Sequence, residues 1–214
     1  SLERFAKPET PGEWRELQER YSVLAHSAKS DTLVSLLDRN PSEKKMVFVR
    51  FRETLYMLGD LLTGCNIPFS RFDGSLSGQE KDGAIQKFRE EVPVLLSTES
   101  GGEGRNLQFC NTLINFDLPW NPQLIEQRIG RIHRIGQARE VFVFNLALKH
   151  TVEERILQIL NEKIHMFELV VGEVQSFLGE MEDQAFANLV FAAWVAQTEE
   201  GRKNAFDHLG EQLL

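Results

Sequence analysis

Short apolar runs alternate with amphipathic stretches through the middle of this chain, and this alternation restricts the possible fold more than any other feature. Strands are predicted at 46–51, 93–96, 112–116 and 141–146, with a weaker one at 68–72. Helices are predicted at 53–63, 77–89, 123–131 and 152–167, and Ser77 and Glu80 form a capping-box pair at the start of the second. Continuous apolar strands separated by helices indicate an α/β fold, a mainly parallel sheet covered on both faces.

The two ends of the chain are predicted to be helical additions to this unit. A polar amphipathic helix is expected at 11–28, and residues 168–214 are expected to form a helical extension. The extension carries an apolar stripe from Phe186 to Trp194, which favours core packing over a groove for a partner. We therefore divide the chain into a lead-in (1–40), an α/β unit (41–167) and an extension (168–214). The first residue is not Met, which suggests a piece of a longer protein.

Composition excludes several classes of protein. No apolar run approaches the roughly 20 residues that span a bilayer, and the N-terminus lacks the layout of a signal peptide. Cys65 and Cys110 have neither zinc-site nor disulfide-framework spacing, so a reduced, cytoplasmic compartment is expected. The formal net charge of -8 argues against tight nucleic-acid binding by the chain as a whole. Any such contact must be local, and four arginines without an acid lie between residues 127 and 139.

The segment from Gln127 to Gln137 carries the strongest chemical signal. Gln127, Arg131 and Arg134 are spaced i, i+4 and i+7, so a helix would align one amide and two guanidiniums along one face. Guanidinium groups suit phosphate, and an arginine against the γ-phosphate stabilises charge in the transition state of phosphoryl transfer. The pattern therefore suggests an NTPase. The alternative for an isolated Arg-x-x-Arg is a solvated basic helix end.

A second candidate segment follows the predicted strand at 93–96. It runs from Leu96 to Leu107 as Leu-Ser-Thr-Glu-Ser-Gly-Gly-Glu-Gly-Arg-Asn-Leu. Its hydroxyls and glycines can present side-chain and backbone donors to phosphate oxygens. Taken alone, this pattern is equally consistent with an ordinary turn.

The ordered set of motifs resembles a known family. Arg71-Phe-Asp-Gly-Ser-Leu-Ser77, the 97–107 segment, Asp117-Leu-Pro-Trp-Asn-Pro122 and the 127–137 segment resemble the C-terminal lobe of Swi/Snf-type DNA translocases, in helicase superfamily two. The resemblance covers about residues 44–167. The Glu-Gly-Arg-Asn and Ile-Gly-Arg elements are similar to the bacterial branch, which includes translocases that recycle RNA polymerase.

The resemblance implies a RecA-like lobe that binds ATP and Mg²⁺ jointly with an N-terminal RecA-like lobe of the same parent chain and tracks double-stranded DNA. It implies that the lobe supplies arginine fingers, nucleotide contacts and contacts to a DNA backbone phosphate, with no metal ligands of its own. The matching positions are Arg131 and Arg134 for the fingers, Gln127, Gly104 and Asn106 for the nucleotide, and Ser97 and Thr98 for DNA. Such a protein is expected to be cytoplasmic and associated with the nucleoid.

The chain also departs from the family pattern. Val49-Arg50 stands where many members carry Ser-Gln, Lys81 stands where Arg is usual, and Glu103 and Arg105 replace apolar residues of eukaryotic members. These changes leave the predicted ATP side intact and weaken the assignment of individual DNA contacts.

The chain contains no G-x-x-x-x-G-K-[ST] phosphate loop and no Asp-Glu magnesium box, so this lobe should not hydrolyse ATP alone. Two alternatives stay open. The first is a non-enzymatic interaction module, for example one that docks on RNA polymerase. The second is an RNA-unwinding helicase.

Overall fold

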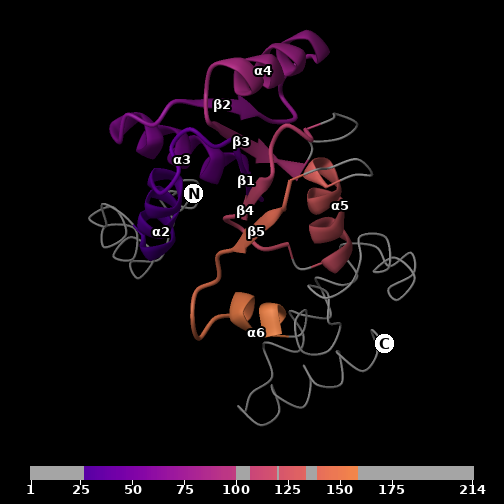
Figure 1. Ribbon diagram of the computed structural model, residues 1–214. Helices are drawn as coiled ribbons and strands as arrows, with labels where there is room; N and C mark the ends of the chain where they lie inside the picture. The colour runs from indigo at the N-terminus through magenta and orange to yellow at the C-terminus, as the bar shows by residue number, and fades with distance from the viewer. Residues whose placement is uncertain (1–26, 100–106, 120, 134–138, 159–214) are drawn as a thin grey trace, which may run out of the picture.

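The computed structural model describes residues 27–99, 107–119, 121–133 and 139–158 (Figure 1). The predicted site residues Gly104, Asn106 and Arg134 lie outside these ranges. The same is true of the 168–214 extension and of nearly all of the helix predicted at 11–28. The domain boundaries at residues 40 and 167 therefore stay a prediction.

A five-stranded sheet forms the centre of the described structure. Its strands are β1 (Lys45–Val49), β2 (Phe69–Phe72), β3 (Val94–Thr98), β4 (Thr112–Asn115) and β5 (Phe142–Asn145). The spatial order is β2-β3-β1-β4-β5, and every pairing is parallel. The predicted α/β fold with a parallel sheet is confirmed, and all five predicted strands are present.

Helices connect the strands as the alternating pattern predicted. They are α3 (Arg52–Gly64), α4 (Gly78–Glu90) and α5 (Pro122–Ile132). Helix α6 (Val152–Gln158) follows β5 and begins at its predicted residue, whereas α2 (Ala28–Asp38) precedes β1, where no helix was predicted beyond residue 28. The ends of α3, α4 and α5 lie within one residue of the predicted ends. The start of α4 owes this agreement to its capping box. The Ser77 hydroxyl accepts from the Glu80 amide, and the Glu80 carboxylate accepts from the Ser77 amide at 2.8 Å.

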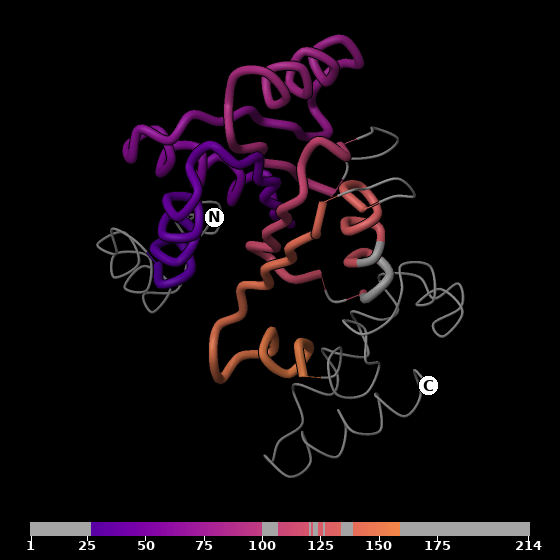
Figure 2. Tube along the Cα trace, in the orientation of Figure 1, coloured from indigo at the N-terminus to yellow at the C-terminus, as the bar shows by residue number. Residues whose placement is uncertain are grey.

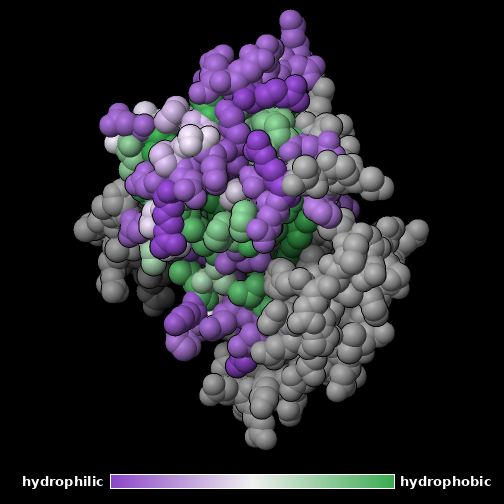
Figure 3. All heavy atoms as spheres, viewed as in Figure 1, coloured by the Kyte–Doolittle hydropathy of each residue, from purple (hydrophilic) through white to green (hydrophobic). Residues whose placement is uncertain are grey.

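The helices cover both faces of the sheet, which gives three layers. On one face, Leu33 of α2 and Leu58 of α3 join a buried cluster with Val47 of β1. On the other face, Phe88 of α4 and Ile132 of α5 pack in a second cluster. Figures 1 and 2 show α2 and α3 on one side of the sheet and α5 on the other. The outer side of α4 is hydrophilic in Figure 3, as expected for a helix that buries only Ile85 and Phe88.

The carboxyl ends of four strands lie along one edge of the sheet. Val49 of β1 is in register with Thr98 of β3, while Asn115 of β4 is in register with Phe48 of β1 and Asn145 of β5. Ligands of parallel α/β sheets bind beyond this edge. The candidate site is therefore expected at this edge.

Candidate functional site

Helix α5 carries two of the predicted site residues to this region. Gln127 and Arg131 are both helical and lie one turn apart, as their i, i+4 spacing predicted. Gln127 is exposed and Arg131 is half-buried, so both side chains lie at or near the surface. Arg134, the third member of the predicted row, lies outside the described residues. The helical placement is confirmed, whereas the catalytic roles stay predictions.

The two predicted DNA contacts occupy the end of β3. Ser97 and Thr98 are the last residues of this strand, and only 0% and 4% of their surfaces are exposed. The Ser97 hydroxyl donates to the Thr98 carbonyl oxygen at 3.0 Å. A contact between these hydroxyls and a DNA phosphate would therefore require a local opening of the strand end.

The most deeply buried charge at the edge is one that the sequence analysis did not assign. Arg128 lies on α5 between Gln127 and Arg131, and its surface is only 2% exposed. Its Nη1 donates to the Asn115 side-chain oxygen at 2.5 Å and to the Asp117 carbonyl oxygen at 3.0 Å, and its Nη2 donates to the Glu99 carboxylate. Helix α5 is thus attached to residues at the ends of β3 and β4.

The surroundings of Arg128 show how its charge is held. Its guanidinium lies 4.7 Å from the centre of the Phe48 ring, a cation–π distance. Burial lowers the pKa of Arg128 from its ordinary value, and the nearby carboxylates of Glu99 and Asp117 oppose this effect. An arginine stays charged under these conditions. Its Nε is buried and has no hydrogen-bond partner among the described residues.

The acceptors of Arg128 are themselves fixed by neighbouring strands. The Asn115 amide donates to the Asn145 side-chain oxygen at 2.8 Å, which joins the ends of β4 and β5. The Asp117 carboxylate accepts from the Arg50 amide at 2.9 Å, which joins β4 to the segment after β1. One polar network therefore spans the carboxyl ends of β1, β3, β4 and β5.

The sequence pattern of α5 indicates that Arg128 is buried and has a polar partner. Ile125, Arg128, Ile129 and Ile132 follow the i, i+3, i+4, i+7 spacing of a core-facing stripe. An arginine in that stripe must be buried, and a buried charge requires a partner. Arg128 was predicted only as one of four arginines in the basic segment, so its burial was not predicted.

A basic and aromatic cluster lies at the β1–β2 side of the sheet. The Arg52 guanidinium donates to the Tyr56 hydroxyl at 2.7 Å, and Arg71 lies 5.5 Å from the centre of the same ring. Arg50 lies 5.5 Å from the ring of Phe51, which is 56% exposed. In a chain with a net charge of -8, these arginines are a local basic surface that the sequence analysis also missed.

Asp73 lies beneath this basic surface and has its charge stabilised. Burial alone would raise the pKa of Asp73, but hydrogen bonds from the Ser75 hydroxyl and amide and the charges of Arg52 and Arg71 bring it below the ordinary value. The carboxylate lies 3.9 Å from Arg52 Nε. Asp73 therefore stays ionised at neutral pH.

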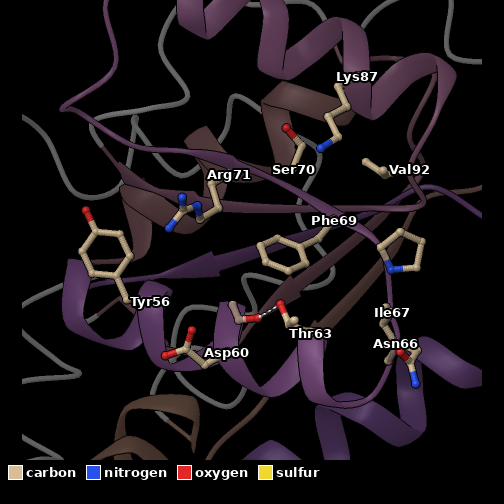
Figure 4. A pocket seen from close by; sticks show the side chains of 12 residues that line it. Tyr56, Asp60, Thr63, Asn66, Ile67, Phe69, Ser70, Arg71, Lys87 and Val92 are labelled. Carbon is tan, nitrogen blue, oxygen red and sulfur yellow. Dashed lines mark hydrogen bonds between the residues drawn. The ribbon is translucent and has the colours of Figure 1, made fainter.

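An open cavity of about 890 Å³ lies away from the predicted site. Figure 4 shows Phe69 of the edge strand β2 inside it, with Asp60 and Thr63 of α3 on one side and Lys87 of α4 on the other. Of the predicted site residues that the structure describes, none lines this cavity. Within the described ranges, no group of three or more His, Cys, Asp or Glu side chains could hold a metal ion, and no helix is long and apolar enough to cross a membrane.

Comparison with known proteins identifies the family. Residues 28–136, which are 109 of the 214, match the helicase conserved C-terminal domain. The chain belongs to this family. It is 43% identical to the Uncharacterized ATP-dependent helicase YqhH of Bacillus subtilis (strain 168), over 90% of this chain and 35% of the relative. The present chain thus spans about a third of that helicase.

Chromatin remodelers are also similar to this helicase lobe. The CHD3-type chromatin-remodeling factor CHR7 of Arabidopsis thaliana is 36% identical over 68% of the chain and 12% of its own length. The human Chromodomain-helicase-DNA-binding protein 1 is 33% identical over 78% of the chain and 10% of its length. Among solved structures, the C-terminal part of the Fun30 ATPase domain matches with a TM-score of 0.60 and 28% identity, covering 86% of this chain and 55% of that one. The predicted resemblance to the C-terminal lobe of Swi/Snf-type helicases is confirmed.

Proposed function

We propose that this chain is the C-terminal motor lobe of an ATP-dependent translocase that moves along double-stranded DNA. The observation that carries the proposal is the placement of Gln127 and Arg131 one turn apart on α5, beside the carboxyl edge of a parallel sheet in a helicase C-terminal lobe. The names of the relatives support ATP and DNA as the ligands, because YqhH is called an ATP-dependent helicase and the human relative is called a helicase-DNA-binding protein.

In this proposal the motor is completed by an N-terminal RecA-like lobe, which supplies the phosphate loop and the acids that hold Mg²⁺. Neither motif occurs in this sequence. Arg131 and Arg134 act as arginine fingers toward the γ-phosphate, where guanidiniums stabilise the charge that develops during phosphoryl transfer. Gln127, Gly104 and Asn106 contribute to the nucleotide side. ATP binding closes the two lobes and hydrolysis reopens them, which moves the grip along the DNA.

In the proposal, Ser97 and Thr98 at the end of β3 contact the DNA once a local opening of the strand end exposes their hydroxyls. The basic surface of Arg50, Arg52 and Arg71 supports it, because a net-acidic chain needs a local cluster of cations to hold a phosphate backbone. Exposed Phe51 and Tyr56 accompany these arginines. A DNA-bound motor of this kind is expected in the cytoplasm, on the nucleoid.

The test is ATP hydrolysis by the chain alone and by the same lobe joined to an N-terminal helicase lobe, each with and without duplex DNA. We expect turnover only in the joined protein supplied with DNA. Stronger stimulation by RNA would favour the RNA-unwinding alternative, and no turnover in any sample would favour an interaction module, for example one that docks on RNA polymerase. Turnover by the isolated chain would contradict the assignment of the missing motifs to another lobe.

A separate variant tests the assignment of Arg131 as an arginine finger. Arg131→Ala in the joined protein should keep nucleotide binding and reduce turnover by about 10³-fold or more. Arg39→Ala is the control, since Arg39 is an exposed arginine at the end of α2. Equal turnover of the two variants would refute the role of Arg131.

A further inference from the structure

The ion pair between Arg128 and Glu99 joins two elements that the proposed mechanism uses separately. Glu99 follows Thr98 directly, so its backbone continues the strand end that carries the proposed DNA contacts. Arg128 lies one helical turn before Arg131 on α5. The carboxylate of Glu99 accepts from Arg128 Nη2, and this contact bridges β3 and α5.

Arg128 is held more firmly in this pair than the arginine of an ordinary surface ion pair, whereas the Glu99 side chain is 35% exposed. Exposed ion pairs contribute little, because both side chains remain free to move and are screened by salt. Here the Arg128 side chain is only 2% exposed, and its Nη1 is fixed at the same time by Asn115 and Asp117. The planar fork of guanidinium allows this, since it donates in several fixed directions at once. A shift of Glu99 would therefore strain the contacts that hold α5 to the sheet.

We propose that Arg128 and Glu99 are positioning residues that keep the proposed DNA-contacting end of β3 and the finger-bearing helix α5 in a fixed relation. The inference rests on the proposed function. Neither residue contacts the nucleotide in this proposal. Their role is to make α5 follow the position of the β3 end, so that DNA bound at that end holds Arg131 in the geometry needed for hydrolysis. A misplacement of about 1 Å in a catalytic group can cost about 10²-fold in rate.

The test measures kcat and KM for ATP in the joined two-lobe protein at saturating duplex DNA. Glu99→Gln keeps the size of the side chain and removes its charge, and Arg128→Lys keeps the charge and removes the fork. Each variant should lower kcat by about 10²-fold with little change in KM for ATP, because the proposed defect lies in the transition state. If Arg128→Lys does not fold, Glu99→Gln decides the question alone.

A matched control distinguishes positioning from general stability. Glu153 of α6 forms a partly buried ion pair with Lys29 of α2 at 2.6 Å, remote from α5 in sequence. Glu153→Gln removes a carboxylate charge from a comparable pair. It should lower the melting temperature without lowering kcat. If Glu99→Gln changes kcat no more than Glu153→Gln does, the inference is overturned.

Two further results separate this inference from the proposed function. The double variant Glu99→Gln with Arg128→Lys should be no slower than the slower single variant, because residues that act as one unit are non-additive. A rate reduced to the product of the two single effects would overturn the pairing. Normal turnover by Arg131→Ala would instead refute the finger role that the proposed function gives to Arg131. Loss of turnover in Arg131→Ala together with a normal Glu99→Gln would refute only the positioning role.

Discussion

Replacing Arg128 by Met tests how much the buried guanidinium stabilises the lobe. The change withdraws the donor to the Asn115 side-chain oxygen at 2.5 Å and the donor to the Asp117 carbonyl oxygen at 3.0 Å. The buried Asn115 oxygen that loses its donor costs about 1–3 kcal/mol, and the part-buried Asp117 carbonyl oxygen costs about 1 kcal/mol. The lost ion pair with Glu99 adds at most about 1 kcal/mol, because the Glu99 side chain is 35% exposed and its carboxylate can be hydrated.

The methionine side chain limits the loss, since its thioether can keep an apolar contact with the ring of Phe48. We therefore expect Arg128→Met to lower the free energy of unfolding by about 3 kcal/mol. The assay is equilibrium unfolding in urea followed by far-UV circular dichroism, with the slope compared between variants to check that the unfolded states are similar.

The matched control is Arg71→Met on β2. Arg71 is an exposed arginine that also lies over an aromatic ring, 5.5 Å from the centre of Tyr56. Because exposed cation–π contacts are weak, this variant should lose less than about 1 kcal/mol. Equal losses in the two variants would refute the argument that the hydrogen bonds of Arg128 stabilise the attachment of α5.

Three other expectations concern single sites. Cys65 is exposed, whereas burial raises the pKa of Cys110 to about 11, so iodoacetamide should modify Cys65 in the native protein and Cys110 only after unfolding, as peptide mass spectrometry would show. Native-state labelling of both would contradict this. The folded pKa of Asp73 lies below its ordinary value of 3.8, so its charge stabilises the fold above that value and this stabilisation is lost as the pH falls through the lower folded pKa. Asp73→Asn should lower the melting temperature at pH 7, and the difference from the unmodified protein should shrink in acid; a difference independent of pH would refute it. Ser77→Ala removes the cap of α4, so it should lower the free energy of unfolding in urea by about 1 kcal/mol. Ser75 lies outside the cap, so Ser75→Ala should leave the hydrogen exchange of the first α4 amides unchanged.

Local sequence rules predicted much of the fold because its elements obey them closely. The strands at 45–49 and 94–98 are buried throughout, as expected for the interior of a parallel sheet. The capping residue Ser77 predicted the start of α4 to within one residue. The ends of strands were less accurate, because pairing partners decide where a strand stops. β3 continues through Ser97 and Thr98 since they pair with β1, although hydroxyl residues were expected to begin the loop.

The same strand pairing explains why the candidate site could be predicted only in part. Helical spacing placed Gln127 and Arg131 together, because both lie on one element. It could not show that Ser97 and Thr98 are buried, or which side chain joins β3 to α5. Those facts depend on contacts between residues far apart in sequence, and Arg128 and Glu99 are 29 positions apart.

A charged residue in the apolar stripe of a helix nevertheless narrows the search for its partner. Arg128 occupies such a position, and α5 packs beside the carboxyl edge where the strands end. In a parallel sheet, acids that come just after strands meet at that edge; Glu99 directly follows β3, and Asp117 lies two residues after the end of β4. Arg128 contacts both residues, the carboxylate of the first and the carbonyl oxygen of the second. The buried arginine therefore predicts where α5 attaches, and the attachment in turn fixes the position of the helix that carries Arg131.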